Sequence, residues 1–183
     1  MIIYFKMLLL TIEQQFFISE GLRIFLSIFI LLVLCMPVFY KILLVMITDS
    51  IDCGISKFFF DDWVDPNTDL YQISDKMTDI ITYLILLAYI IYIEYLDDKK
   101  NNFLILLLSY RLIGEILYFS TKERYFLLFF PNFFLETLLV LVGVKHFNVD
   151  EYYLPFFAIC IFLWKLLQEY YLHVYKENHL MES

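Results

Sequence analysis

The stretch "LLVLCMPVFYKILLVMIT", from Leu31 to Thr48, decides how the chain folds. It is almost entirely apolar, and only Pro37 and Lys41 interrupt it. Because the residue before a proline disfavours the helical conformation, helices tend to end there. We therefore predict a turn at Met36–Pro37 with a separate helix on either side. The alternative is one long kinked helix.

Apolar runs of this kind make up most of the chain, with charged residues between them. The 183 residues are 62% hydrophobic, whereas a soluble domain is about 45–50% apolar. A helix that crosses a bilayer needs about 20 mostly apolar residues. We predict an all-α integral membrane protein, a single domain over residues 1–183. Its six-transmembrane-helix bundle would have spans at about 16–36, 38–53, 75–96, 102–119, 125–144 and 153–174; without the turn at Pro37 there would be five.

The ends of the chain are expected on the same side of the membrane, because the number of spans is even. A short N-terminal helix lying in the interface is predicted before the first span, with Lys6, Glu13 and Gln14 toward water. Six basic residues fall on the side of the termini and four on the other. This bias favours a cytoplasmic location for the termini. The net charge of −8 argues against a nucleic-acid partner, whose phosphates need a basic surface.

Aspartate is concentrated between Ile47 and Tyr83, a segment that holds eight of them between two apolar runs. Carboxylates at a membrane edge are costly and are candidates for function. The same segment also contains spacings that arise by chance, such as Asp62 and Asp65. The plain alternative is a solvated loop between two helices.

Two aspartate pairs lie at the facing ends of two spans. Asp49 and Asp52 end the second span, and Asp75 and Asp79 begin the third. Spacings of three and four place both side chains on one face of a helix. In an antiparallel pair of spans, the four carboxylates would meet at one end of the bundle. Oxygen ligands suit Mg²⁺ or Mn²⁺, and a two-metal site can clamp a phosphate or pyrophosphate during displacement.

This segment resembles the motif of the CDP-alcohol phosphotransferases. That motif, D-x-x-D-G-x-x-A-R followed by G-x-x-x-D-x-x-x-D, lies across the second and third of six transmembrane helices. The two aspartate pairs match its four acids. The other matched positions are Ser56 and Lys57 at the Ala-Arg pair and Arg23 at an early arginine of the family. Cys53 and Tyr71 stand where the motif has glycine, and Gly54 comes one position late.

The resemblance implies an enzyme of phospholipid synthesis that moves a phosphatidyl or phospho-alcohol group from a CDP-linked donor to a small alcohol. Asp49, Asp52, Asp75 and Asp79 would hold two Mg²⁺ or Mn²⁺ ions, and Asp79 would also act as general base. The donor phosphate would contact Lys57, together with Gly54 and Ser56. Family members often form homodimers, so a dimer stays open. The alternative is a non-catalytic membrane protein, either a structural or assembly factor or a decayed relative of the enzymes.

Two further polar features lie within apolar spans. Arg111 and Glu115 are four residues apart in the fourth span. We favour an internal ion pair that hides both charges from lipid; the alternative is that Arg111 contacts a substrate phosphate. Pro131 is expected to kink the fifth span and to leave a backbone carbonyl that needs a new partner.

Overall fold

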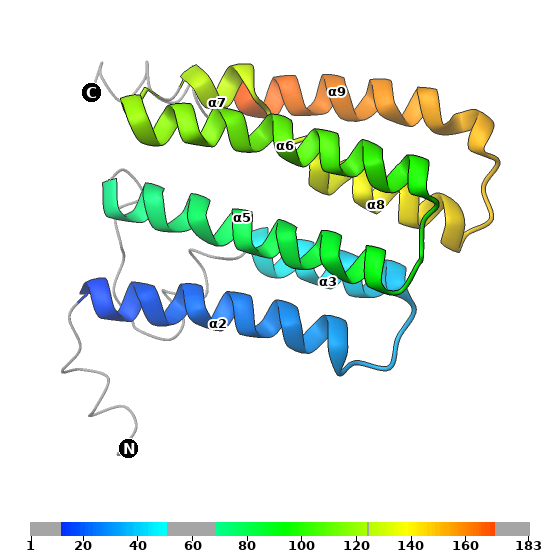
Figure 1. Cartoon of the computed structure of the whole chain (residues 1–183), viewed down its shortest axis with the longest axis horizontal. Helices are drawn as coiled ribbons and strands as arrows, with labels where there is room; N and C mark the ends of the chain where they lie inside the picture. The colour runs from blue at the N-terminus through cyan, green and yellow to red at the C-terminus, as the bar shows by residue number, and fades with distance from the viewer. Residues whose placement is uncertain (1–11, 51–68, 124, 171–183) are drawn as a thin grey trace. The chain divides into compact units, whose positions relative to one another are not determined.

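The protein is described by a computed structural model that covers residues 12–50, 69–123 and 125–170. The chain divides into two compact units, Met1–Ile85 and Leu86–Ser183, which are considered separately below. The described residues form helices and connecting turns, with no strand among them (Figure 1). The all-α prediction is therefore confirmed for this part of the chain.

The first unit contains α2 (Ile12–Leu32), α3 (Val38–Ser50) and the beginning of α5 (Asp69–Tyr92). α2 and α3 pack against each other. The turn expected at Pro37 is present, because five residues separate the end of α2 from the start of α3, and the amide of Tyr40 donates to the carbonyl of Pro37 at 3.1 Å. A single long kinked helix is therefore wrong. Lys41 folds back and donates to the carbonyl of Leu31 at 2.7 Å, which satisfies a group in the last turn of α2.

The beginning of the chain differs in part from the prediction. Glu13 and Gln14, expected in a separate interfacial helix, lie in the first turn of α2. The rest of that expected helix, including Lys6, lies outside the described residues. α2 extends further toward the N-terminus than its apolar run, because Glu and Gln are good helix formers and a helix can continue through them.

The second unit continues from the last turns of α5 through α6 (Asp98–Thr121), α7 (Tyr125–Phe129), α8 (Phe134–His146), the short 3₁₀ helix η1 (Glu151–Tyr153) and α9 (Leu154–Tyr170). α6 packs against α7 and α8, and α9 packs against the same two helices. The carboxylate of Asp97 caps α6 by accepting from the amide of Lys100 at 3.0 Å. Lys122 ends α6 in a left-handed conformation, with φ of 62°.

The expected fifth span is interrupted around Pro131, between α7 and α8. The break exposes backbone carbonyls, and side chains of α6 bond to them. The hydroxyl of Tyr110 donates to the carbonyl of Phe129, and Nη1 of Arg111 donates to that of Phe130 at 2.8 Å. The predicted kink and its need for a new hydrogen-bond partner are both confirmed. Gly114 lets α6 approach this break closely, since a Cβ there would overlap the Cβ of Phe130 and lie 2.9 Å from its Cγ.

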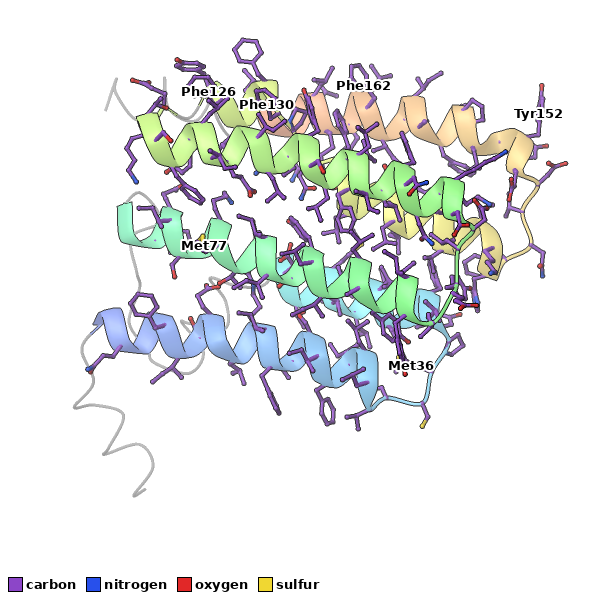
Figure 2. All side chains as sticks on the ribbon, in the orientation of Figure 1. Met36, Met77, Phe126, Phe130, Tyr152 and Phe162 are labelled. Carbon is purple, nitrogen blue, oxygen red and sulfur yellow. The ribbon has the colours of Figure 1, made fainter. Side chains whose placement is uncertain are left out.

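Large apolar side chains remain exposed on several helices, although each unit also has a buried core. Figure 2 shows all described side chains on the ribbon, with Phe162 on α9 and Tyr152 on η1 among those labelled. The exposed set includes Phe25 and Leu32 on α2, Leu106, Ile113 and Ile116 on α6, and Phe156, Ile159, Leu163, Trp164 and Leu167 on α9. By length and composition, two helical segments of the described chain could cross a membrane, residues 98–121 and 125–146.

Candidate functional site: a carboxylate cluster around Arg23

Arg23 of α2 is the centre of the candidate site in the first unit. Its side chain is only 2% exposed, although arginine is almost never fully buried unless it is paired. Glu20 lies one turn earlier on the same helix, and its Oε2 is 3.5 Å from Nη1 of Arg23. Ser27, one turn later, donates to the carbonyl of Arg23 at 3.0 Å. α2 therefore presents a polar stripe within an otherwise apolar helix.

Three of the predicted metal ligands converge on this guanidinium. Oδ1 of Asp49, from α3, is 3.2 Å from Nη2 of Arg23. Oδ1 of Asp75, from α5, is 3.2 Å from Nη1, and Asp79 accepts a hydrogen bond from Nη2. Asp75 and Asp79 thus share one face of α5, which their spacing predicted. The sequence also placed Asp49 near this pair, and all three contact one arginine.

Lys76 adds a second positive charge to the cluster. Its Nζ lies 2.7 Å from Oδ2 of Asp75 and 3.3 Å from Oδ2 of Asp79. All six side chains are at most 17% exposed. When ionised, the four carboxylates outweigh the two cations by two negative charges. Buried charge of one sign is costly, so this cluster favours a further cation or a proton.

The donor set fits a divalent cation in its chemistry. Carboxylate oxygens are the preferred ligands of Mg²⁺ and Mn²⁺. Oδ1 of Asp49 is buried and accepts no hydrogen bond from the described residues, so it can still coordinate a cation. Within the same residues, no three His, Cys, Asp or Glu side chains are already arranged to hold a metal ion. The Arg23 guanidinium, rather than a gap between oxygens, lies where the carboxylates converge.

Several residues of the predicted site cannot be placed. Asp52, Gly54, Ser56 and Lys57 lie outside the described residues, so their roles remain predictions from the resemblance. Cys53, at a motif glycine position, lies outside them too. Tyr71, at the other glycine position, is 8% exposed and lies in the first turn of α5. Its bulk therefore lies inside the first unit, where the motif would have no side chain.

Arg111 belongs to the second unit and is engaged by neighbouring groups. Its Nε donates to Oε1 of Glu115 at 2.9 Å, and both side chains are at most 5% exposed. The internal ion pair that we favoured is confirmed. Nη1 of Arg111 also bonds to the backbone at the α7–α8 break. A contact between Arg111 and a substrate phosphate stays a prediction.

Two kinds of partner in these contacts were not predicted from the sequence. Glu20 and Lys76 join the Arg23 cluster, and their spacing of three from Arg23 and from Asp79 could have indicated this. In the second unit, Lys165 of α9 pairs with Glu136 of α8 at 2.6 Å. No local spacing could reveal that second contact, because it depends on how α8 and α9 pack.

Comparisons of the chain with family models, curated proteins and solved structures found no match.

Proposed function

We propose that the protein is an integral membrane phosphotransferase that transfers a phosphatidyl or phospho-alcohol group from a CDP-linked donor to an alcohol. The observation that carries the proposal is the convergence of Asp49, Asp75 and Asp79, from two helices, on one buried locus with excess negative charge. These are three of the four positions at which the chain resembles the CDP-alcohol phosphotransferase motif. A solvated loop would leave the same carboxylates apart and in water.

The membrane setting is part of the proposal. Soluble proteins rarely expose extended apolar surface, and α6 and α9 carry many exposed large apolar residues. Two helical segments of the described chain have the length and composition of spans. We infer that α2, α3, α5 and α9 also cross the membrane, which gives six spans with both termini and the acidic loop in the cytoplasm. α3 has 13 described residues, which is shorter than a helix that crosses a bilayer. A span at α3 would therefore have to include residues that follow it.

Each residue would have a defined task in the reaction. Asp49, Asp52 and Asp75 would hold divalent metal, and Asp79 would accept the proton of the acceptor hydroxyl. The acceptor oxygen forms a bond to the transferred phosphorus, the phosphorus–oxygen bond to CMP breaks, and the hydroxyl proton passes to the Asp79 carboxylate. Lys57 would contact the donor phosphate. Bound Mg²⁺ or Mn²⁺ would neutralise the charge that develops on CMP as it leaves.

Arg23 and Lys76 would position the carboxylates of the cluster for this reaction. They hold the carboxylates together by ion pairs at 2.7–3.3 Å. Because both contact Asp75 and Asp79, they hold these two side chains in place before substrate arrives.

The experiment is release of CMP from CDP-diacylglycerol by the purified protein, with Mg²⁺ and a panel of alcohols. We expect release that requires both the metal and one class of alcohol. Asp79→Asn should lower the rate by about 10²–10⁴-fold, the usual loss when a general base is removed. Asp98→Asn is the matched control, because Asp98 is exposed at the start of α6. Equal rates for the two variants would contradict the proposal.

A second candidate function is a structural membrane protein without catalysis. Arg23 already lies among the carboxylates. A buried arginine with acidic partners can have a purely structural role, in which it joins α2, α3 and α5. In that case the panel yields no CMP, and Mg²⁺ leaves the thermal stability of the purified protein unchanged. Metal-dependent release of CMP would exclude this alternative.

A further inference from the structure

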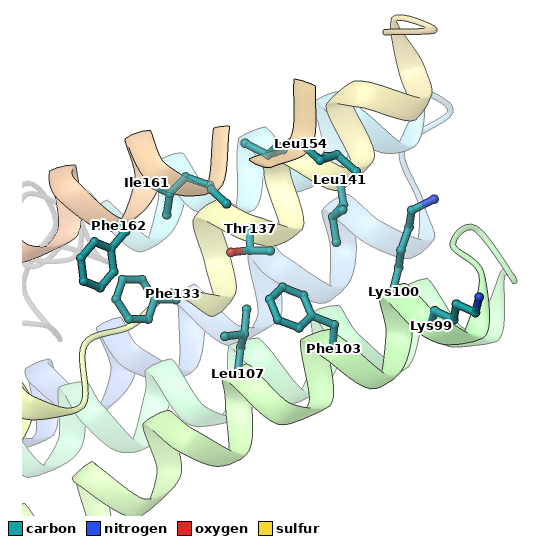
Figure 3. Close-up of a pocket in the computed structure, with 12 residues that line it drawn as sticks. Lys99, Lys100, Phe103, Leu107, Phe133, Thr137, Leu141, Leu154, Ile161 and Phe162 are labelled. Carbon is teal, nitrogen blue, oxygen red and sulfur yellow. The ribbon is translucent and has the colours of Figure 1, made fainter. Parts of the chain in front are cut away.

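The second unit contains an apolar cavity that the proposed catalysis does not use. It lies between α6, α8 and α9 and has a volume of about 380 Å³, within the range of small-molecule sites. Phe103 and Leu107 of α6, Leu141 of α8 and Ile161 of α9 point into it (Figure 3). Phe133 and Phe162 stack at 5.7 Å between ring centroids. A cavity with such walls suits a hydrocarbon chain.

One end of this cavity is positively charged. Lys99 and Lys100, in the first turn of α6, line it beside Phe103 (Figure 3). Lys100 and Leu141 also line an adjoining cavity of about 460 Å³, which extends to Lys145. The apolar cavity therefore continues into a polar one at Lys100.

Five charged residues line the two cavities: Lys99, Lys100, Lys145, Asp97 and Glu151. Lys100 is shared by Asp97 at 2.7 Å and Glu151 at 2.6 Å. Lys145 donates to the carbonyl of Tyr95 and lies 4.5 Å from the centre of its ring. Lys99 is exposed. Three lysines thus face two carboxylates, and lysine is a common point-charge partner of phosphate.

We propose that this pair of cavities binds a phosphate-bearing lipid, with one acyl chain between α6, α8 and α9 and the phosphate at Lys99 and Lys100. The apolar walls match the chain, and the two lysines at one end match the phosphate. Every residue of the site lies in the second unit, so the proposal stands independently of the Arg23 cluster and of any catalysis.

The test is a titration of the purified full-length protein in detergent with dioleoyl phosphatidic acid, followed by native mass spectrometry. Ala158 lines the cavity, so Ala158→Phe should fill part of it and weaken binding about tenfold or more, as expected when a chain loses its buried contacts. Ala88→Phe is the control, because Ala88 is an exposed residue of α5 outside the cavity. Equal affinity of the two variants would overturn the proposal.

A second variant tests the charged end without changing the packing of the helices. Lys99→Gln should weaken binding about two- to fivefold, the scale of an exposed charge contact. The loss should shrink in high salt, because ions screen exposed charges. Lys122→Gln, at the opposite end of α6, should bind the lipid as the unaltered protein does. A loss of the same size in both lysine variants would contradict a phosphate site at Lys99.

Two further ligands distinguish the lipid from its parts. Dioleoylglycerol keeps the chains and lacks the phosphate, whereas glycerol phosphate keeps the phosphate and lacks the chains. We expect each to bind about tenfold more weakly than phosphatidic acid or worse, because each uses one half of the site. If glycerol phosphate competes as well as the lipid, the chain cavity plays no part and the proposal is wrong. If dioleoylglycerol binds as tightly as phosphatidic acid, the lysines do not contribute to binding and the proposal is also wrong.

Discussion

At the scale of single residues, Arg23 determines the character of the candidate site. It contacts carboxylates from α2, α3 and α5, and two of these partners are separated from it by 52 and 56 residues in the chain. A buried arginine among acids joins helices whether or not a metal is bound. The position of Arg23 is therefore compatible with both an enzyme and a structural protein. A variant that lacks the arginine allows stability and metal binding to be measured separately.

Arg23→Gln should destabilise the protein strongly. The change leaves three buried aspartates without their shared cation, and breaking a buried ion pair in this way typically costs about 3–5 kcal/mol. Thermal unfolding of the purified protein would measure the loss. If the aspartates bind divalent cations, Mg²⁺ should restore part of the lost stability. An unchanged melting temperature would show that the Arg23 contacts carry little energy.

Some contacts of the candidate site could be predicted from the sequence, and others could not. The spacing of Asp75 and Asp79 predicted a shared helical face, and both do contact Arg23. The central position of Arg23 could not be predicted, because it depends on contacts between α2 and α5, which lie far apart in the chain. The resemblance pointed to Arg23 as a matched residue without giving its partners. Lys76 was overlooked because a lysine between two aspartates also suits a solvated helix end.

At the scale of elements, the break between α7 and α8 is stabilised by α6. Pro131 removes a backbone donor, and Tyr110 and Arg111 bond to the carbonyls at the break. Gly114 allows these contacts by letting α6 lie directly against Phe130. The kink was predictable from the proline, whereas the helix that packs against it was not.

Gly114→Ala should destabilise the second unit by about 1–3 kcal/mol, the usual cost of overpacking. The added methyl would overlap Phe130 close to its backbone, where a side chain cannot simply rotate away. Gly21→Ala is the matched control, because a Cβ on Gly21 of α2 would meet nothing within 4 Å. That control should be neutral or stabilising by up to about 1 kcal/mol through helix propensity. Thermal or denaturant unfolding of both variants measures the difference, and similar effects would contradict the close approach.

The cap of α6 should depend on pH through Asp97. The hydrogen bonds from the side chain and the backbone amide of Lys100 lower the pKa of the Asp97 carboxyl. A lowered pKa in the folded state means that the cap stabilises above the unfolded pKa of about 3.9. That stabilisation is lost as the pH falls through the folded pKa.

Asp97→Ala should therefore lower the melting temperature at neutral pH more than Asp98→Ala does, because the Asp98 carboxylate does not form the cap. The difference between the two variants should shrink as the pH falls below about 4. Melting curves across this range measure it. A difference that stays constant down to pH 2 would contradict an ionised cap.

At the scale of the whole molecule, composition predicted an all-helical chain with apolar spans. The described residues are helical, and two segments have the length and apolarity of spans. The remaining segments are harder to assign from composition, because α5 begins with Asp69, Asp75 and Asp79 and α3 is short. The charges that mark the candidate site are the same charges that weaken the membrane signal.

Six spans place both termini on the same side of the membrane, and the bias in basic residues predicts that this side is the cytoplasm. A glycosylation tag fused to either end should stay unmodified, whereas a tag inserted near Asn148, between α8 and α9, should be modified on the opposite side of the membrane. Lumenal modification of one terminus alone would mean an odd number of spans. Five spans would give that result.

Binding of Mn²⁺, measured by electron paramagnetic resonance, shows whether the carboxylates around Arg23 form a divalent metal site. The purified protein, Asp75→Asn and Asp98→Asn would be titrated side by side. We predict saturable binding of about two ions per chain, as expected for a two-metal phosphotransfer site. The Asp75 variant should bind at least about tenfold more weakly, because even outer-shell changes cost 10–100-fold, and the Asp98 variant should bind as the unaltered protein does. Equal binding by all three proteins, or none by any, would contradict a metal site at these carboxylates.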